Sequence, residues 1–196
     1  MHCIIIMRLD IKMYDNISYW QERGKHYYSN FKYNKQFAQQ EYELIEFIKD
    51  NRIPHQSVLE IGCGFGRISR LMVDNFHDIL YDAIDISQDQ IDNAVSLTKG
   101  NRINYRCMNI SDLDYYTEYD LILAVEVLMH IPPLAIHDII RKLVNKSKHF
   151  MHIDYYEQRP VQLAEHNFNH NYPEIYRELH KYVTSKRIKN QMLFST

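Results

Sequence analysis

Three of the five glycines in this 196-residue chain fall within five positions, at Gly62, Gly64 and Gly66. A chain with so little glycine keeps the residue for places where the backbone must turn sharply or approach a ligand closely. An apolar run, 57–61, precedes the three glycines, and a stretch with helical periodicity, 67–75, follows them. We therefore predict a strand, a tight loop and the start of a helix. The free backbone N–H groups in the first turn of that helix favour the binding of a negatively charged group.

Short apolar runs alternate with longer stretches of helical period along the rest of the chain. The expected strands are 57–61, 79–84, 103–108, 121–125 and 150–153, and the expected helices are 36–51, 67–75, 87–100, 132–145 and 173–182. Two further β candidates, 183–188 and 191–195, flank a turn at Lys189. This order predicts an α/β fold with a doubly wound, mostly parallel sheet and an antiparallel C-terminal hairpin. Ligands of such sheets bind at the carboxyl ends of the strands.

Local signals and totals define the domain organisation. Ser87 is expected to cap the helix that begins there, with Gln90 completing a capping box. We divide the chain into a leader, 1–35, and a single domain, 36–196. The formal net charge of −2 gives no reason to expect a nucleic-acid partner. Apolar runs are too short to span a bilayer, and three cysteines without metal-ligand spacing indicate reduced thiols. We expect a cytoplasmic protein without a metal site, and a homo-oligomer is compatible with these totals.

The spacing of the glycines distinguishes between two kinds of cofactor loop. A dinucleotide fingerprint reads G-x-G-x-x-G, whereas the glycines here read G-x-G-x-G and Arg67 occupies the sixth position. An acidic residue, Glu60, lies two positions before the first glycine. The run from Val58 to Gly66 resembles the first motif of the class I S-adenosylmethionine (SAM)-dependent methyltransferases. A nucleotide-dehydrogenase domain is the weaker alternative, because the chain is short for one that also needs a substrate domain.

Three further motifs resemble that family in the same order. Asp85 ends the second predicted strand, Asn109 follows the third, and the stretch 119–132 resembles the family's fourth motif. The resemblance implies that SAM is the cofactor. The cofactor-binding residues that it implies are Arg23, Glu60, Gly62, Cys63, Gly64, Gly66, Asp85, Ile86, Asn109, Ile110, Val125 and Glu126.

Within that set the resemblance assigns several roles. Asp85 is expected to accept hydrogen bonds from the ribose diol, and Asn109 to accept from the adenine amino group. Glu60 either orders the glycine loop or reaches the amino group of SAM. Arg23 is expected to meet the SAM carboxylate from a leader that folds over the cofactor as a lid. The alternative is that the aromatic side chains of this leader simply pack on the edge of the sheet. Cys63 is a small residue suited to the loop rather than a nucleophile, since no base neighbours it in sequence.

Methyl transfer requires alignment of the acceptor and, for an acceptor that carries a proton, a general base. His130 follows the strand 121–125 and is the first candidate base, with bracing of the following loop as the alternative. Asp154 is the second catalytic candidate, and strand alternation points it to the same face as His152. The expected acceptor-binding residues lie on or after the strand 150–153: His152, Tyr155, Tyr156, His166, His170 and Tyr172. The H-x-x-x-H spacing within this set lacks a third ligand for a metal.

These observations predict a methyltransferase that acts on a hydroxyl or amine of a small-molecule acceptor, such as a sugar or a nucleotide-linked metabolite. A protein or tRNA methyltransferase and a non-catalytic SAM-binding partner subunit are the alternatives. An intact acceptor cavity faced by His130 and Asp154 favours the enzyme. A filled cavity beside a large exposed apolar patch favours the partner subunit.

Overall fold

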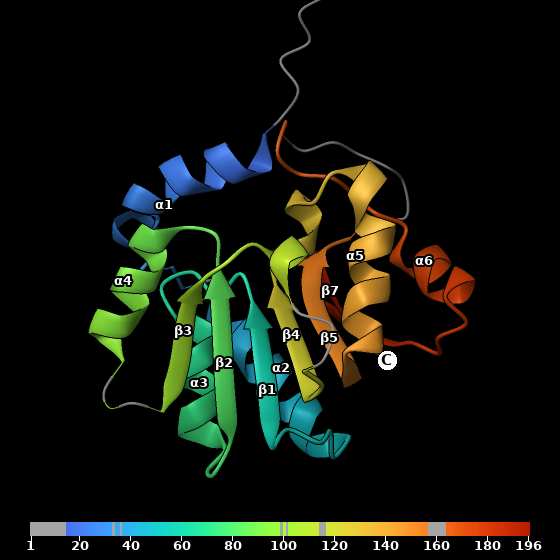
Figure 1. Cartoon of the computed structure of the whole chain (residues 1–196). Helices are drawn as coiled ribbons and strands as arrows, with labels where there is room; N and C mark the ends of the chain where they lie inside the picture. Colours follow the sequence, from blue (N-terminus) through green and yellow to red (C-terminus); the bar gives the residue numbers. More distant parts are fainter. Residues whose placement is uncertain are drawn as a thin grey trace, which may run out of the picture.

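One sheet organises the computed structural model, which describes residues 15–32, 34–35, 37–98, 100, 102–113, 117–156 and 164–196. Its strands are β1 (Ser57–Ile61), β2 (Leu80–Asp85), β3 (Ile103–Cys107), β4 (Tyr119–Val125), β5 (Ser147–Tyr155), β6 (Thr184–Ile188) and β7 (Gln191–Ser195). They lie in the order β3-β2-β1-β4-β5-β7-β6 (Figure 1). Strands β1 to β5 are parallel, and β7 pairs antiparallel with both β5 and β6. The predicted sheet and its antiparallel hairpin are confirmed.

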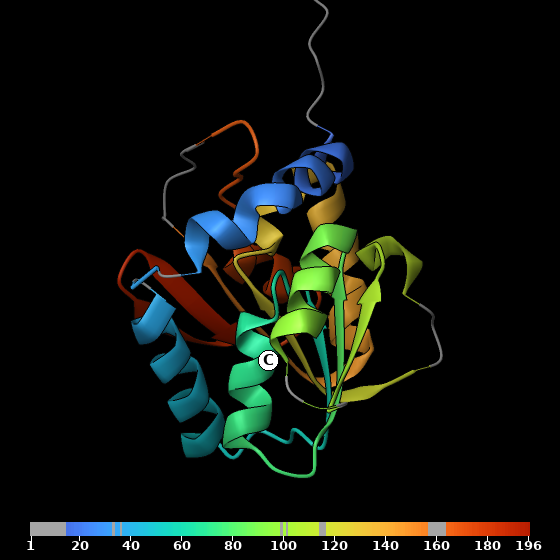
Figure 2. The ribbon, with the colours of Figure 1, turned by 90° about the vertical axis from the view of Figure 1, so that its left-hand side faces the viewer.

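Helices cover both faces of this sheet (Figures 1 and 2). They are α1 (Asn16–Phe31), α2 (Phe37–Asp50), α3 (Arg67–Asn75), α4 (Gln88–Leu97), α5 (Pro133–Asn145) and α6 (Tyr172–Glu178), with 3₁₀ turns η1 (Ile110–Asp112) and η2 (Leu128–His130). Buried side chains of α2, α3 and α4 form one core cluster with the sheet, and those of α5 and α6 form a second. The sheet therefore has a separate hydrophobic core on each face.

Strand β4 lies at the centre of the sheet and is buried on both faces. Leu121 and Leu123 belong to one core cluster, whereas Ile122 and Ala124 belong to the other, and all four are 0% exposed. Burying one Leu or Ile side chain contributes roughly 1.5–3 kcal/mol. The apolar run that predicted a fully buried strand is confirmed, and the loop that follows β4 starts from a firmly packed base.

Tertiary contacts shift some predicted boundaries. β5 begins at Ser147, three positions before the predicted strand 150–153, because its polar start pairs with β4 and hides the apolar pattern. α6 ends at Glu178 rather than at 182. His180 adopts a left-handed conformation, with φ 53°, and Lys181 N–H donates to the Tyr176 carbonyl, which terminates the helix.

The predicted capping box at the start of α4 is wrong. Ser87 is the N-cap residue, but its side chain makes no capping hydrogen bond. Gln90 instead donates from Nε2 to the Gly24 carbonyl of α1. A Cβ at Gly24 would lie 2.7 Å from Cβ of Ser87. Glycine at position 24 lets α1 approach α4 this closely. The Gln90 side chain, which the local sequence assigned to the capping box, therefore bonds to α1 instead.

Candidate functional site

A cavity lies at the carboxyl ends of β1, β2 and β4, beneath helix α1. Figure 2 shows α1, in blue, lying across the ends of the strands. The empty space between the lining atoms is about 1120 Å³, including the part that is open to solvent. Its walls bring together the glycine loop, the ends of β2 and β3, the loop after β4 and one side of α1. This is the edge at which the sequence predicts ligand binding.

The glycine loop turns in a way that other residues would disfavour. Gly62, Gly64 and Gly66 have φ values of 65°, 53° and 74°, in the left-handed region. A Cβ at Gly62 would lie 2.5 Å from Cγ2 of Val127. Around Gly64 the nearest atom to an added Cβ is Oε1 of Gln90, at 3.8 Å. The loop is therefore packed closely on the β4 side and open toward the cavity at its middle glycine.

Asp85 connects the glycine loop to the start of α4. Its Oδ2 accepts a hydrogen bond from Gly64 N at 2.8 Å, and its Oδ1 accepts from Ser87 N at 2.9 Å. Burial raises the pKa of Asp85, and the backbone hydrogen bonds act in the opposite direction. Each carboxylate oxygen keeps a further lone pair. Asp85 can therefore hold the loop and accept hydrogen bonds from a ligand at once.

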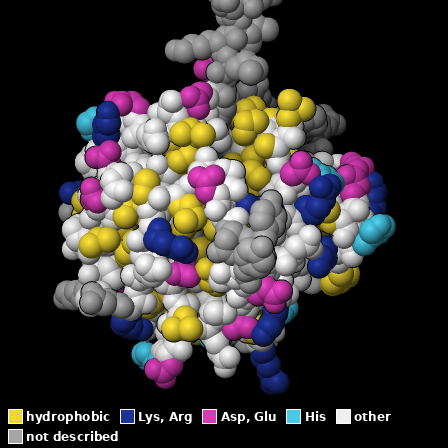
Figure 3. All heavy atoms as spheres, viewed as in Figure 1, with side chains coloured by type: hydrophobic (Ala, Val, Ile, Leu, Met, Phe, Trp, Pro, Cys, Tyr) yellow, Lys and Arg dark blue, Asp and Glu magenta, His cyan; other side chains and the backbone are white. Residues whose placement is uncertain are grey.

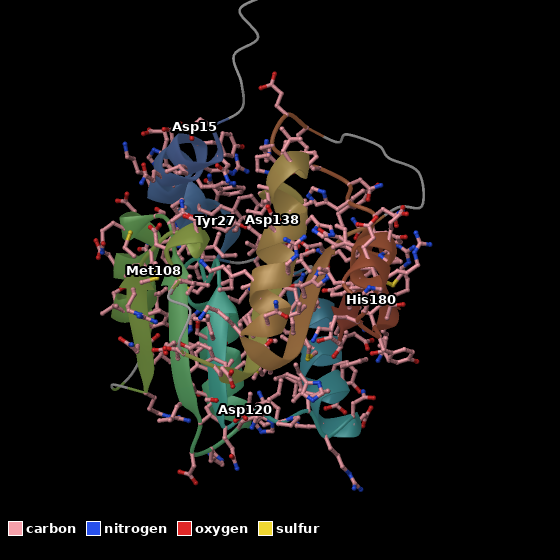
Figure 4. The ribbon with its side chains drawn as sticks, turned by 45° about the vertical axis from the view of Figure 1, so that its right-hand side comes forward. Asp15, Tyr27, Met108, Asp120, Asp138 and His180 are labelled. Carbon is pink, nitrogen blue, oxygen red and sulfur yellow. The ribbon has the colours of Figure 1, made fainter. Side chains whose placement is uncertain are left out.

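The ends of β2 and β3 form an apolar wall with one amide. Ile86, Met108, Asn109 and Ile110 line the cavity there, and Figure 4 labels Met108 at the end of β3. Asn109 Oδ1 accepts a hydrogen bond from Ser111 N at 3.0 Å, which caps η1. Sequence reasoning missed Met108, although it is the last position of the strand predicted at 103–108.

Two predicted cofactor residues are occupied within the fold. Glu60 is 2% exposed and accepts hydrogen bonds from Ser69 of α3 and, at 3.1 Å, from Tyr81 of β2. Burial raises the pKa of Glu60 to about 7. Burial likewise raises the pKa of the Cys63 thiol, which disfavours the thiolate. Glu60 thus ties the strand before the glycine loop to its neighbours, whereas a contact with the SAM amino group stays a prediction.

His130 lines the cavity from η2. Its Nδ1 lies 2.8 Å from the His166 carbonyl oxygen. A carbonyl only accepts, so we assign the proton to Nδ1 and the lone pair to Nε2. Burial lowers the pKa of His130 to about 4, so the ring is neutral near neutral pH. The Trp20 ring of α1 packs on it, with centroids 4.4 Å apart.

One side of α1 faces the cavity. Asn16, Trp20, Gly24 and Tyr27 line it, and Figure 4 shows Tyr27 below α1, on the side of the strand ends. Arg23 is exposed and does not line the cavity; its guanidinium lies 5.7 Å from the centroid of the Trp20 ring. The signal that sequence reasoning missed is the helical spacing of these four positions, which places them on one face.

Comparison with known proteins identifies the domain. Residues 58–149 match a sequence family described as a methyltransferase domain. The malonyl-[acyl-carrier protein] O-methyltransferase of Acetivibrio thermocellus is 24% identical over 106 residues, which cover 54% of this chain and 36% of that protein. The ubiquinone biosynthesis O-methyltransferase of Rickettsia bellii is 31% identical over 110 residues, 54% of this chain and 44% of that protein. The matched part thus spans less than half the length of these curated relatives.

Solved structures share the fold. The magnesium protoporphyrin IX methyltransferase of Synechocystis with bound S-adenosylhomocysteine (SAH) has a TM-score of 0.72 at 14% identity, covering 91% of this chain and 95% of that one. A SAM-dependent methyltransferase from Clostridium acetobutylicum has a TM-score of 0.65 at 14% identity, covering 89% and 97%. Residues 58–149 therefore form a methyltransferase domain, and the fold around them is that of solved SAM-dependent methyltransferases. The family predicted from four short motifs is confirmed, with SAM as its cofactor.

The cavity of this methyltransferase domain fits SAM. Its middle glycine leaves space for a ligand, and Asp85 retains lone pairs for a ribose diol. Within the described part of the chain, Trp20 Nε1 and Gln90 Oε1 are buried without a hydrogen-bond partner, and both residues line the cavity. Buried polar atoms that lack a partner are costly unless a ligand or water satisfies them. These atoms therefore point to a polar ligand that lies between α1 and α4.

Three of the predicted catalytic and acceptor-binding residues of this methyltransferase lie in its core. His152, Asp154 and Tyr172 are at most 1% exposed and do not line the cavity. His152 Nδ1 lies 2.8 Å from Asp154 Oδ2, which confirms that the two share a face. Asp154 Oδ1 accepts from Met129 N at 3.1 Å. Because β4 and β7 flank β5 and α6 covers it, Asp154 contacts η2, which carries His130, rather than the cavity.

The remaining predicted acceptor-binding residues also lie off the cavity wall. Tyr155 and Tyr156 are half-buried near the end of β5. His170 is buried, with Nε2 3.1 Å from the Leu128 carbonyl oxygen. His166 stacks on Tyr19 of α1, with centroids 4.6 Å apart. The described part of this segment, 164–170, therefore joins η2 to α1, and direct contact of these side chains with an acceptor stays a prediction.

Metal and membrane features are not found in the ranges that the structure describes. Those ranges contain no group of three His, Cys, Asp or Glu side chains arranged to hold a metal ion. Among the described helices, none combines the length and apolar character needed to cross a bilayer. On the face shown in Figure 3, acidic and basic side chains are interspersed.

Proposed function

We propose that this chain transfers the methyl group of SAM to a hydroxyl oxygen of a small-molecule acceptor. The observation that carries the proposal is the placement of His130 on the same cavity as the glycine loop and Asp85. Its Nδ1 is occupied by the His166 carbonyl, which leaves Nε2 as the proton-accepting atom. Curated relatives named as O-methyltransferases support an oxygen acceptor.

The cavity residues have separate tasks in this proposal. SAM supplies an electrophilic methyl group on a sulfonium. The glycine loop and Asp85 fix the orientation of the cofactor, since both are held by hydrogen bonds that exist without it. Trp20 and His166 pack around His130 and exclude water from it. His130 Nε2 accepts the hydroxyl proton of the acceptor as the new carbon–oxygen bond forms and the bond between the methyl carbon and sulfur breaks, which leaves SAH as the product.

The position of α1 supports a small acceptor. Asn16, Trp20 and Tyr27 close the cavity from the side of α1. The segment that contains His166 packs against the same helix. A side chain of a folded protein or a base in tRNA would reach the cavity only after displacement of α1. An amine acceptor is the alternative within this proposal, since a neutral amine attacks the methyl carbon of SAM without first losing a proton to a base.

A screen of acceptors with methyl-labelled SAM tests this function. The panel contains hydroxyl compounds and their amine counterparts on sugar, nucleotide and aromatic frameworks, together with tRNA and bulk protein. We expect label in hydroxyl compounds, about 10²-fold less of it with His130→Gln, and inhibition by SAH. Label confined to tRNA or protein would contradict the small-molecule proposal. Tight SAH binding without transfer to any acceptor would instead favour a partner subunit.

A further inference from the structure

A continuous series of polar side chains runs behind one wall of the cavity, and only its two ends, Arg67 and Glu126, line the cavity. Arg67 donates to Glu41 Oε1 at 3.0 Å and to Gln40 Oε1 at 2.6 Å. Gln40 Nε2 donates to Gln191 Oε1 at 2.9 Å, and Gln191 Nε2 donates to Glu126 Oε1 at 2.5 Å. Each amide donates on one side and accepts on the other, so both glutamines have a defined orientation. Gln191, the first residue of β7, is thereby fixed as a donor to Glu126.

Glu126 is held in an unusual conformation at this wall. Its φ is 59°, in the left-handed region that non-glycine residues seldom adopt. Its N–H donates to the Ile153 carbonyl at 2.7 Å, which anchors the strained position to β5. Backbone outliers of this kind cluster at ligand sites because the surrounding structure must maintain them. The side chain lines the cavity, and among the described residues only Gln191 donates to its carboxylate.

Two hydrogen-bond donors face the same end of the cavity. Tyr27 lines it from α1 (Figure 4), and burial together with the charge of Glu126 raises the pKa of Tyr27 to about 12. Its hydroxyl is therefore protonated and able to donate. Arg67 lies 4.0 Å from the centroid of the Phe37 ring and also lines the cavity. A guanidinium has five N–H groups, so its bonds to α2 leave others for a ligand.

This end of the cavity lies away from the residues expected around adenine. Ile86 and Asn109 follow β2 and β3, on one side of β1, whereas Glu126 follows β4, on the other side. A ligand whose adenosine lies over β2 and β3 therefore extends its far end toward Glu126. In SAM that end is an amino acid, with an ammonium and a carboxylate. An ammonium pairs with a carboxylate, and a carboxylate pairs with hydroxyl and guanidinium donors.

We infer that Glu126, positioned by Gln191, binds the ammonium group of the amino-acid end of SAM, and that Tyr27 and Arg67 bind its carboxylate. The inference rests on the proposed function, because it requires SAM in this cavity. It places on these residues the tasks that the sequence suggested for Glu60 and Arg23. Gln191 acts through Glu126 and is a positioning residue, so the C-terminal hairpin contributes to cofactor selection.

Calorimetry with two ligands tests this inference. SAH carries the amino-acid end, whereas 5′-methylthioadenosine carries the same adenosine and sulfur without it. We expect the wild-type protein to bind SAH at least tenfold more tightly. Loss of one charge-assisted hydrogen bond corresponds to roughly 1.5–3 kcal/mol, or about tenfold to a hundredfold. Glu126→Gln should weaken the binding of SAH by that factor and change the affinity for methylthioadenosine by less than about twofold. Gln191→Leu should reduce the ratio of the two affinities about threefold.

Glu43→Gln is the matched control. Glu43 is a carboxylate of α2 that pairs with Lys186 of β6 at 2.5 Å and does not line the cavity, so its loss should leave both affinities unchanged. Equal binding of the two ligands by the wild-type protein, or equal weakening of both by Glu126→Gln, would overturn the inference. If Glu126→Gln does not fold, Gln191→Leu decides by the same affinity ratio, and an unchanged ratio overturns the inference. A wild-type protein that binds neither ligand would contradict the proposed function instead.

Discussion

On the β1–β2 side of the cavity, contacts join residues that are close along the chain, whereas on the β4–β5 side they join distant ones. Asp85 bonds to Gly64 and Ser87, and neither contact depends on α1. His130 bonds to the segment after β5 and packs on Trp20 of α1. The side expected to hold adenosine is therefore organised by contacts within one β-α-β unit, β1-α3-β2, and the start of the next helix. The acceptor side is complete only when α1 and the segment 164–170 pack on η2.

Each side of the cavity also holds one buried titratable side chain, an acid on the β1–β2 side and a base on the β4–β5 side. Glu60 lies beneath the glycine loop, and burial raises its pKa to about 7. His130 lies on the acceptor side, and burial lowers its pKa to about 4. Burial disfavours the charged form in both cases, so Glu60 keeps its proton below about pH 7 and His130 stays unprotonated above about pH 4. Four changes, from the largest expected effect to the smallest, test this contrast.

Asp85→Ala should have the largest effect. It removes the proposed ribose acceptor, its contact with Gly64 of the glycine loop and its contact with Ser87 at the start of α4. We expect SAH affinity to fall about 10³-fold, or about 4 kcal/mol, since more than one charge-assisted hydrogen bond is lost. Asp82→Ala is the control, because Asp82 lies on the same strand but bonds to Asn104 and Tyr119 outside the cavity. Unchanged affinity of Asp85→Ala by calorimetry would reject the ribose assignment.

Glu60→Gln should change how stability depends on pH. The folded-state pKa of about 7 lies above the ordinary glutamate value of 4.5, so between these pH values the folded protein binds a proton that the unfolded chain has released. This contribution is fully present below pH 4.5 and is lost as pH rises through 7. Across that window it amounts to at most about 3 kcal/mol.

Denaturant unfolding of both proteins at several pH values measures this contribution. The lowered pKa of His130 gives a slope of opposite sign, with stability gained as pH rises from about 4 to 6.5. Only the difference between wild type and Glu60→Gln therefore isolates Glu60. That difference should decline steadily from pH 4.5 to 7. A constant offset across the range would show that Glu60 does not titrate there.

His130→Gln should separate the two sides of the cavity. We expect turnover to fall about 10²-fold, since the proton acceptor is lost, while SAH affinity changes by less than about threefold because the cofactor contacts of Asp85 are independent of η2. Single-turnover kinetics and calorimetry give the two quantities. Near-normal turnover would leave His130 with the loop-bracing role that its bond to His166 also supports.

Gly24→Ala should have the smallest effect and act mainly on the acceptor side. The added Cβ would displace α1 from Ser87 and Gln90. We expect turnover to fall about tenfold and SAH affinity about threefold, which corresponds to roughly 1.4 and 0.6 kcal/mol. Trp20 is the only tryptophan, so a red shift of its fluorescence would report the movement of α1. Ser29→Ala, on the exposed side of α1, is the control. Equal losses of turnover and of SAH affinity in Gly24→Ala would contradict the difference between the two sides of the cavity.

The cofactor side could be predicted largely from sequence. Gly62, Gly64 and Asp85 lie at strand ends, where short motifs and apolar periodicity determine both the turn and the neighbours. The acceptor side could not be predicted in the same way. His152 and Asp154 carry suitable chemistry on or just after the predicted strand 150–153, yet β7 and α6 bury them. Glu126 shows the same limit, since its partner Gln191 comes from the far end of the chain.

The amino-acid sequence alone determined the family, the parallel sheet and the glycine loop, because each depends on local propensities and on the period of apolar residues. Tertiary structure alone decided which polar side chains face the cavity. Tyr27 enters it because Gly24 lets α1 pack closely on α4. Asp154 is excluded from it because a returning hairpin covers its strand. Burial and orientation of a side chain depend on segments that meet only in the folded chain, and no local pattern records them.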